Sequence, residues 1–260
     1  WLKHNLSQAR SQAPDAMSLG MRFLVASLFL AVVNCEEKTL KLPSFDLLSV
    51  NSLIDVQVTV DANISEASLK LEADENAMSL ISSDVWPTGY GSALVLGRSA
   101  SYFWANPVPI ELGKATLTVP KPLLSIGASS GATVHADVAG GSVFSDSAGT
   151  VTVANWVGSD SPIPPSFRAN SRGRTIINGG EPVKFAYIGA SSDGVVVVAS
   201  EVKSSQIDAS SQGEITVNSV GTARVVCSSN ARVSTYGGGE VQEVSTWGCG
   251  GIKNSNTILP

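Results

Sequence analysis

A serine between glycines is the first feature of the sequence that could carry a reaction. Gly127-Ala128-Ser129-Ser130-Gly131 matches the G-x-S-x-G pattern around the nucleophile of serine hydrolases. That nucleophile needs a strand–turn–helix context together with a histidine and an acid, and no helical pattern follows the motif. His135 is the only histidine beyond residue 35. We therefore interpret the motif as structural and expect no catalytic residues.

Paired carboxylates are a second candidate chemistry, because polysaccharide hydrolases and lyases use them as acid, base or nucleophile. The acids of the second half fall at different offsets from the nearest glycine and form no obvious cluster: Asp137, Asp146, Asp193, Asp208 and Glu214. A polysaccharide-active enzyme is the alternative that they leave open.

Metal and cofactor motifs give little support to other activities. No zinc-type spacing of Cys and His, P-loop or dinucleotide fingerprint occurs in the sequence. Glu72-Ala73-Asp74-Glu75 could ligate calcium, but a solvated turn is the favoured interpretation, because no calcium-binding nonapeptide repeat accompanies it. We predict no cofactor and no metal.

The charge of the chain argues against a nucleic-acid partner. The formal net charge is -5, whereas proteins that bind nucleic acid draw much of their affinity from neutralising phosphates. Arg168, Arg172 and Arg174 form a local basic cluster, for which we weigh an anionic ligand against a solvated turn.

A repeated phrase organises the second half of the chain. Its clearest copy is Ile188–Val197, in which an apolar strand end is followed by Ala-Ser-Ser-x-Gly and another apolar strand. The equivalent glycine recurs at 131, 149, 173, 194 and 213, is replaced by Ala231, and returns at 250. The spacings of 18 to 24 residues, with no helical pattern between them, are typical of a β-solenoid.

The small residues of the phrase have a structural explanation. A chain that turns a corner leaves the β region, and we expect the glycine to adopt a positive φ there. At the sixth copy, Asn230-Ala231 replaces x-Gly, which predicts a turn shifted by one residue, since Asn also tolerates positive φ. Long excursions are expected at 155–166 and 178–180, where the spacing lengthens.

These features predict an all-β fold: a right-handed, single-stranded β-helix with about seven short coils. Residues 36–260 form one domain, with N-terminal strands over 45–120 and repeat coils over 123–260. Ile54–Asp61 alternates apolar and polar residues as a half-buried strand does. Val85–Pro109 has the composition of a loop-rich insertion, and its aromatics, together with one in a later excursion, are candidates for a binding surface or for plugs at the end of the core: Trp86, Tyr90, Tyr102, Trp104 and Trp156.

Residues 1–35 resemble a leader with a signal peptide. Arg22 precedes an apolar run over 23–33, which is too short to span a bilayer and typical of a signal-peptide core. We predict cleavage after Cys35, with lipid attachment to Cys35 as the rival, and no transmembrane segment once the leader is removed. The predicted location is therefore secreted or at the cell surface.

Export bears on two further predictions. Cys227 and Cys249 are the cysteines left after the leader is removed, and they lie one repeat apart. We predict a disulfide between them, with two free thiols as the alternative. Asn63-Ile64-Ser65 is a glycosylation sequon that matters in a eukaryotic host.

The order of elements resembles a known family. An alternating strand pair reaching Leu71–Asn76 precedes Leu117–Pro120, Leu124–Ile126 opens the coils, and Gly248-Cys249-Gly250-Gly251 closes them. This order is similar to the head GIN domain of auto-transporter adhesins, over roughly residues 45–260. The resemblance implies an exported right-handed β-helix without assigned catalytic residues.

The preferred functional hypothesis is an exported, non-enzymatic adhesion or surface-binding module whose ligand is a carbohydrate or a protein surface. The alternatives are a polysaccharide-active lyase or hydrolase on the same scaffold and a purely structural component of a wall or matrix.

Overall fold

The fold is built almost entirely from β-strands. The computed structural model describes residues 35–98, 111–158 and 162–255, and within them the only helix is α2 (Glu75–Leu80). The predicted all-β class is confirmed. The predicted leader lies outside the described residues, except for Cys35, where the first strand begins.

Within the described residues, eighteen strands pair into one sheet, which is folded into two ladders. Ladder A contains, in spatial order, β1 (Cys35–Leu42), β4 (Ala67–Asp74), β7 (Glu111–Val119), β3 (Leu53–Val60), the first part of β9 (Thr133–Ser145), β10 (Thr150–Trp156), β12 (Arg174–Ile177), the first parts of β14 (Val195–Ala209) and β15 (Glu214–Cys227), β16 (Arg232–Tyr236) and β18 (Gly251–Asn254). Ladder B contains β5 (Ile81–Thr88), β6 (Gly91–Arg98), β2 (Leu47–Val50), β8 (Leu123–Ala128), the second part of β9, β11 (Ser166–Ala169), β13 (Ala186–Ala190), the second parts of β14 and β15, and β17 (Glu240–Ser245).

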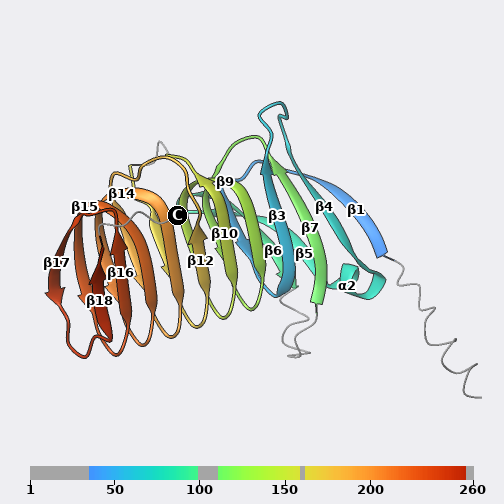
Figure 1. Ribbon diagram of the computed structural model, residues 1–260. Coiled ribbons are helices and arrows are strands. Elements are labelled where there is room, and N and C mark those ends of the chain that lie inside the picture. Colours follow the sequence, from blue (N-terminus) through green and yellow to red (C-terminus); the bar gives the residue numbers. More distant parts are fainter. Residues whose placement is uncertain (1–34, 99–110, 159–161, 256–260) are drawn as a thin grey trace, which may run out of the picture. The chain divides into compact units, whose positions relative to one another are not determined.

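Successive passes of the chain pair in parallel from β8 onward. Thr150 aligns with Arg174, Arg174 with Val195 and Val195 with Glu214, so each pass returns to the same ladder position after one repeat. Figure 1 shows the strands of this unit side by side, from β17 and β18 back to β3 and β7. The repeat of 18 to 24 residues is therefore the sequence separation between neighbouring parallel strands of a ladder.

The N-terminal strands make the sheet mixed, which the sequence interpretation did not anticipate. β4 pairs antiparallel with both β1 and β7, and β5 pairs antiparallel with β6.

Lys70 on β4 donates hydrogen bonds to Glu72 and Glu37, which raise the pKa of Lys70. The helix α2 follows β4 and begins at Asp74, whose side chain accepts a hydrogen bond from the Ala77 amide at 2.8 Å.

Apolar side chains from both ladders fill the interior. β3 alternates buried and less buried residues, as predicted for Ile54–Asp61. Val151, Val153, Ile215 and Val217 are buried while the threonines between them are partly exposed. Alternation is expected because neighbouring side chains of a strand point to opposite faces.

The six corners from Ser129–Ala132 to Ser228–Ala231, which connect ladder B to ladder A, share one tight geometry. In the corner Ser191–Gly194, the Gly194 amide donates to the Ser191 carbonyl at 2.9 Å, and Ser192 and Asp193 both have positive φ, at 51° and 64°. Two central residues at positive φ define a type I′ turn. The Asp193 amide also donates to the carbonyl of Ser211 in the next corner at 3.2 Å, so the corners are hydrogen-bonded to each other through their backbones.

The prediction that the corner glycine has a positive φ is wrong at most corners. The residues with positive φ are the two before it, and the glycine is required for a different reason. A Cβ atom on Gly194 would lie 2.2 Å from the Ala169 carbonyl oxygen in the preceding pass, and one on Gly213 would lie 2.3 Å from the Ala190 oxygen. At these two corners, close stacking of backbones therefore explains the glycine.

The prediction of a shifted turn at Asn230-Ala231 is also wrong. Ser229 and Asn230 have the positive φ values of the other corners, and Ala231 occupies the glycine position with its methyl group buried. The shift occurs instead at the first corner, where Gly131 is the second residue with positive φ and Ala132 takes the glycine position.

The interruptions of the repeat fall where the spacing lengthens. No strand is assigned to the described part of 157–165 or to 178–185, which separate β10 from β11 and β12 from β13. The predicted loop-rich insertion begins differently, because Val85–Thr88 and Gly91–Arg98 form an antiparallel hairpin. Its remainder, 99–110, lies outside the described residues.

The predicted disulfide is confirmed. Cys227 at the end of β15 is bonded to Cys249 in the last corner, with 5.2 Å between their Cα atoms. It links neighbouring passes at the C-terminal end, where, among the described strands, β17 pairs with β15 and β18 with β16 on one side only. Cys35 is a free, exposed cysteine.

Substitution of a corner glycine tests the stacking constraint. We expect Gly194→Ala to lower the free energy of unfolding by about 1–3 kcal/mol, because the new methyl group overlaps a backbone carbonyl. Gly189→Ala is the matched control: its Cβ would meet nothing closer than 3.6 Å, so we expect a change within about 0.5 kcal/mol. Urea unfolding of both variants makes the measurement, and equal effects would contradict the steric explanation.

Removal of the disulfide tests how the last pass is held. We expect Cys249→Ala to lower the free energy of unfolding by about 3 kcal/mol and to speed amide exchange in β16 to β18 before other strands. Ser228→Ala, in a neighbouring corner, is the control. Alkylation of Cys227 and Cys249 in the unreduced protein would show that the bond is absent.

Candidate binding face

The outward side chains of ladder B lie in two rows that cross its strands. Row 1 contains Ser49, Gly127, Phe144, Arg168, Gly189, Asp208 and Val226. Row 2 contains Leu47, Ser125, Ser142, Ser166, Tyr187, Gln206 and Arg224. Neighbours in a row are separated by the strand spacing of about 4.8 Å. Residues far apart in the sequence are therefore presented together on one surface.

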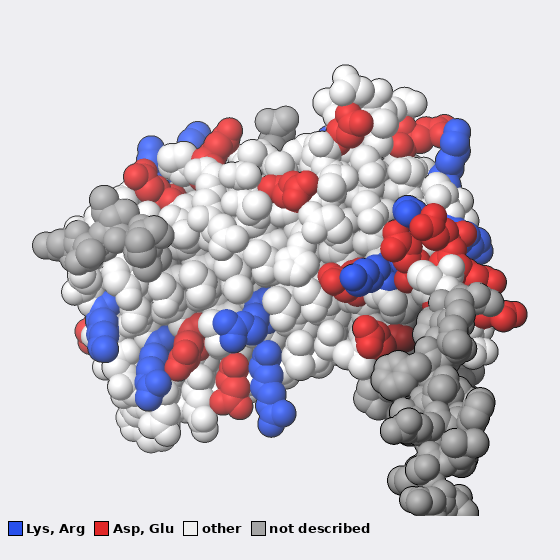
Figure 2. Space-filling model, turned by 45° about the vertical axis from the view of Figure 1, so that its right-hand side comes forward, with Lys and Arg blue, Asp and Glu red and all other residues white. Residues whose placement is uncertain are grey.

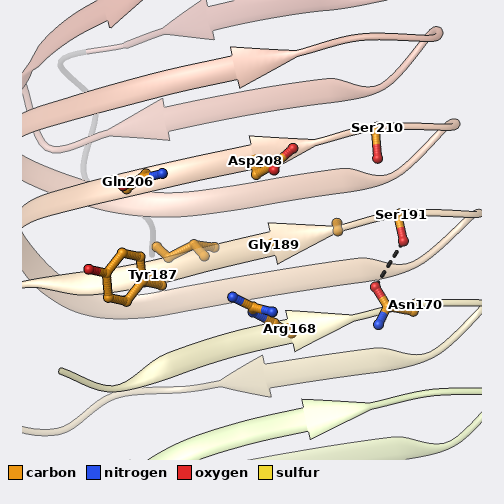
Figure 3. Close-up of a pocket in the computed structure, with 10 residues that line it drawn as sticks. Arg168, Asn170, Tyr187, Gly189, Ser191, Gln206, Asp208 and Ser210 are labelled. Atoms are coloured by element: carbon orange, nitrogen blue, oxygen red, sulfur yellow. Dashed lines mark hydrogen bonds between the residues drawn. The ribbon is translucent and has the colours of Figure 1, made fainter. Parts of the chain in front are cut away.

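A depression of about 260 Å³ lies in this surface at Gly189. Gly189 has no side chain to fill its place in row 1, and Arg168 and Asp208 stand on the two neighbouring strands. Figure 3 shows these two residues on either side of Gly189, with Tyr187 toward one end of the strand and Ser191 toward the other. The missing side chain creates the depression.

The depression places opposite charges near each other without pairing them. Arg168 and Asp208 are exposed and lie two strands apart, about 10 Å between their backbones. No ion pair found within the described part of the chain joins them. An arginine guanidinium binds carboxylates through two hydrogen bonds, and a carboxylate accepts hydrogen bonds from hydroxyl groups. Both side chains are thus available to a ligand.

Aromatic and amide groups complete the depression. Tyr187 is 39% exposed, and its ring packs edge to face against Phe185 with 5.0 Å between centroids, which fixes its orientation. Gln206 lies beside it on β14. At the corner, the Ser191 hydroxyl donates to the Asn170 side-chain oxygen at 2.8 Å. An aromatic ring beside amide, hydroxyl and charged groups can bind a polar ligand that also has an apolar face.

A second hollow of about 370 Å³ lies on the same ladder, toward the N-terminal strands. Leu47, Ser125 and Ser142 of row 2 line it, with Tyr90 and Ile163 as its most exposed apolar residues. Tyr90 comes from the turn of the β5–β6 hairpin, and Ile163 from the excursion between β10 and β11. The interruptions of the repeat therefore supply walls to this hollow.

The five aromatics predicted as a binding surface fall into three groups. Trp86 and Tyr90 are exposed, at 59% and 77%, on the β5–β6 hairpin. Tyr102 and Trp104 lie outside the described residues. Trp156 is buried, donates its indole N–H to the Gly141 carbonyl at 2.9 Å and packs edge to face on Phe167, so it belongs to the core.

Phe144, Tyr187 and Gly189 were missed by the sequence analysis. Phe144 is 41% exposed, and its ring lies over Gly127, where a Cβ atom would overlap it. The available signal was positional: within alternating strands, Tyr187 and Gly189 fall on the outward side. Their contribution to a common surface depends on the register between passes, which the repeat alone did not supply.

The residues considered for catalysis are dispersed. His135 and Asp137 are exposed on ladder A, where Asp137 accepts a hydrogen bond from Gln57 at 3.0 Å. Glu214, also on ladder A, pairs with Arg232 at 3.2 Å. Asp146 and Asp193 lie at corners, and Asp208 lies on ladder B. Ser129 begins a corner and is followed by β9 rather than by a helix.

The possible ion sites are similarly separated. Glu72 pairs with Lys70 and Asp74 caps α2, and no group of three or more His, Cys, Asp or Glu within the described ranges could hold a metal. Arg168 lies on ladder B, Arg172 at a corner and Arg174 on ladder A, so they form no common patch. Figure 2 shows acidic and basic residues toward the margins of the visible face and a broad middle of uncharged residues.

The structure bears on the predicted glycosylation site and on the predicted absence of a transmembrane segment. Asn63 is exposed in the turn between β3 and β4, where its amide group donates to Asp61, and its glycosylation remains a prediction. Among the described helical residues, no helix is long and apolar enough to cross a membrane.

Comparison with solved structures identifies proteins of similar fold. A candidate adhesin from Bacteroides fragilis matches with a TM-score of 0.60 and 14% identity, over 85% of this chain and 96% of that one. A candidate adhesin from Parabacteroides merdae matches with a TM-score of 0.59 and 11% identity, over 85% and 95%. A candidate lipid-binding protein from Parabacteroides distasonis matches with a TM-score of 0.51 and 14% identity, over 86% and 97%.

No family model and no curated protein matches the sequence. At these identities the likeness to the solved structures shows a shared fold.

Truncation of two tryptophans tests the assignment of core and surface. We expect Trp156→Ala to lower the free energy of unfolding by about 3–5 kcal/mol, because it removes a buried ring and its hydrogen bond. Trp86→Ala, the control, removes an exposed ring and should change it by less than about 0.5 kcal/mol. Urea unfolding distinguishes them, and an effect of Trp156→Ala as small as that of the control would contradict the core assignment.

Proposed function

We propose that the protein is an exported, non-enzymatic adhesion or surface-binding module that uses the outward face of ladder B. The observation that carries the proposal is the depression at Gly189, where an exposed Tyr187 ring lies beside Arg168 and Asp208, for which no ion pair is found among the described residues. The strands beneath the depression are hydrogen-bonded on both sides, so a ligand would be bound by side chains rather than by free backbone groups.

The scaffold that we propose is a right-handed, single-stranded β-helix of about seven coils, of the kind found in the head GIN domain. The parallel pairing of successive passes supports it, and so does the likeness in fold to candidate adhesins. The antiparallel strands β1, β4 and β5 are an addition at the N-terminal end of that scaffold.

Export is part of the same proposal. The apolar run 23–33 would direct the chain across a membrane, with cleavage after Cys35 or lipid attachment at Cys35. The Cys227–Cys249 disulfide supports an oxidising destination, because such bonds persist mainly outside the reducing cytosol. The proposed location is secreted or at the cell surface.

Binding and adhesion are favoured over polysaccharide cleavage because of how the acids are placed. Glycoside hydrolysis needs two carboxylates on either side of one bond. Asp208 is the one carboxylate that lines the Gly189 depression, whereas Asp137 and Glu214 lie on the other ladder.

Retention on immobilised polysaccharides and surface proteins tests the proposal, with released reducing ends scored in the same incubation. We expect retention without cleavage, and we expect Tyr187→Ala to weaken binding at least about fivefold because an aromatic contact is lost. Trp247→Ala is the control, since Trp247 is 83% exposed in the last corner, away from ladder B's hollows.

Release of reducing ends would instead favour the polysaccharide-active enzyme. Neither retention nor cleavage would favour a structural role. Equal losses in Tyr187→Ala and Trp247→Ala would show that ladder B is not the binding face.

A further inference from the structure

We propose that ladder B binds a linear acidic polysaccharide, with the chain running along the stack and a sugar carboxylate held by Arg168. This inference rests on the proposed binding function and names its ligand class. It joins the hollow at Tyr90 and the depression at Gly189 into one extended site.

Row 2 connects the two hollows. From Leu47 it continues through Ser125 and Ser142, whose side chains line the hollow walled by Tyr90, and then through Ser166, whose Oγ atom is buried, to the exposed ring of Tyr187. Four strand steps separate Leu47 from Tyr187, or about 19 Å at the usual spacing. That length matches an oligosaccharide of several sugars, whereas a single sugar would occupy one hollow.

The repeat of the sheet suits a repeating ligand. Neighbouring residues of a row advance by about 4.8 Å, which is close to the advance per sugar in an extended glycan. Each sugar of such a chain would meet an equivalent position on the next strand. Phe144 and Tyr187, exposed in rows 1 and 2, offer ring faces against which the apolar faces of sugars can pack.

Charge selects an acidic chain over a neutral one. Arg168 points over the depression: its Cγ and Cδ atoms lie 3.6 and 3.9 Å from where a Cβ of Gly189 would be. No ion pair within the described ranges involves its guanidinium, so a ligand carboxylate would be its first anionic partner. Asp208, two strands on, would accept hydrogen bonds from sugar hydroxyls.

A peptide strand is less suited to this face. Peptides that bind sheets by strand addition need a free backbone edge, but β11 and β13 are hydrogen-bonded on both sides. Contacts must therefore come from side chains that stand above the sheet, as a glycan with many hydroxyl groups requires.

Polygalacturonate and its methyl ester provide a matched pair of probes, because they share a backbone and differ in the carboxylate. We expect the full chain to bind polygalacturonate at least about tenfold more tightly than the ester, since charge-assisted hydrogen bonds are the stronger kind. Arg168→Gln should remove most of that preference. Arg174→Gln makes the same change of charge on ladder A and should preserve it.

Length dependence is the second readout. Affinity for oligogalacturonides should rise with each added sugar until the chain spans both hollows, and Tyr90→Ala should weaken long oligomers while leaving disaccharides unchanged.

Equal binding of the acid and its ester, or equal losses in Arg168→Gln and Arg174→Gln, would overturn the inference. Retention of other polysaccharides or of proteins through Tyr187, without binding to polygalacturonate, would also overturn it and would leave the proposed binding function standing.

Discussion

The close approach of successive backbones is the constraint on which the rest of this structure depends. Parallel passes spaced by about 4.8 Å leave no room for a Cβ atom at Gly194 or Gly213, because a carbonyl oxygen of the preceding pass is already there. The same spacing lets the Asp193 amide reach the carbonyl of Ser211 in the next corner. Corner residues such as Ser192 occupy a left-handed conformation that is unfavourable by roughly 1 kcal/mol for a residue other than glycine, and these corner-to-corner hydrogen bonds help to offset that cost.

The sequence predicted those features that depend on the chain's own alternation and period. Buried Val151 and Val153, the strand at β3, the two excursions and the Cys227–Cys249 bond could be predicted because each follows from side-chain direction or repeat spacing. The role of the corner glycines could not, because a glycine selected by positive φ and one selected by a neighbouring carbonyl look identical in one dimension. The register at Ala132 was missed for the same reason: Gly131 matches the repeat in letters but occupies a different turn position.

The candidate site depended still more on information from neighbouring passes. Arg168, Gly189 and Asp208 are separated by about twenty residues each, and their alignment appears only when β11, β13 and β14 are placed in register. Trp156 shows the opposite error, since its place in a proline-rich excursion suggested exposure while its indole N–H is in fact bonded to a backbone carbonyl inside the fold. Composition indicates which residues are available for a surface, but pairing decides which of them reach it.

The ends of the stack explain why the candidate site lies between them. A terminal pass has no neighbour to bury one side, so it needs additional support: antiparallel β1 and β4 with α2 at one end, and the disulfide at the other. Between the ends, every strand of ladder B from β2 to β14 has partners on both sides. A surface fixed in this way loses little conformational entropy when a ligand binds. The stacking that restricts the corners to small residues therefore also holds the outward rows in a geometry ready for binding.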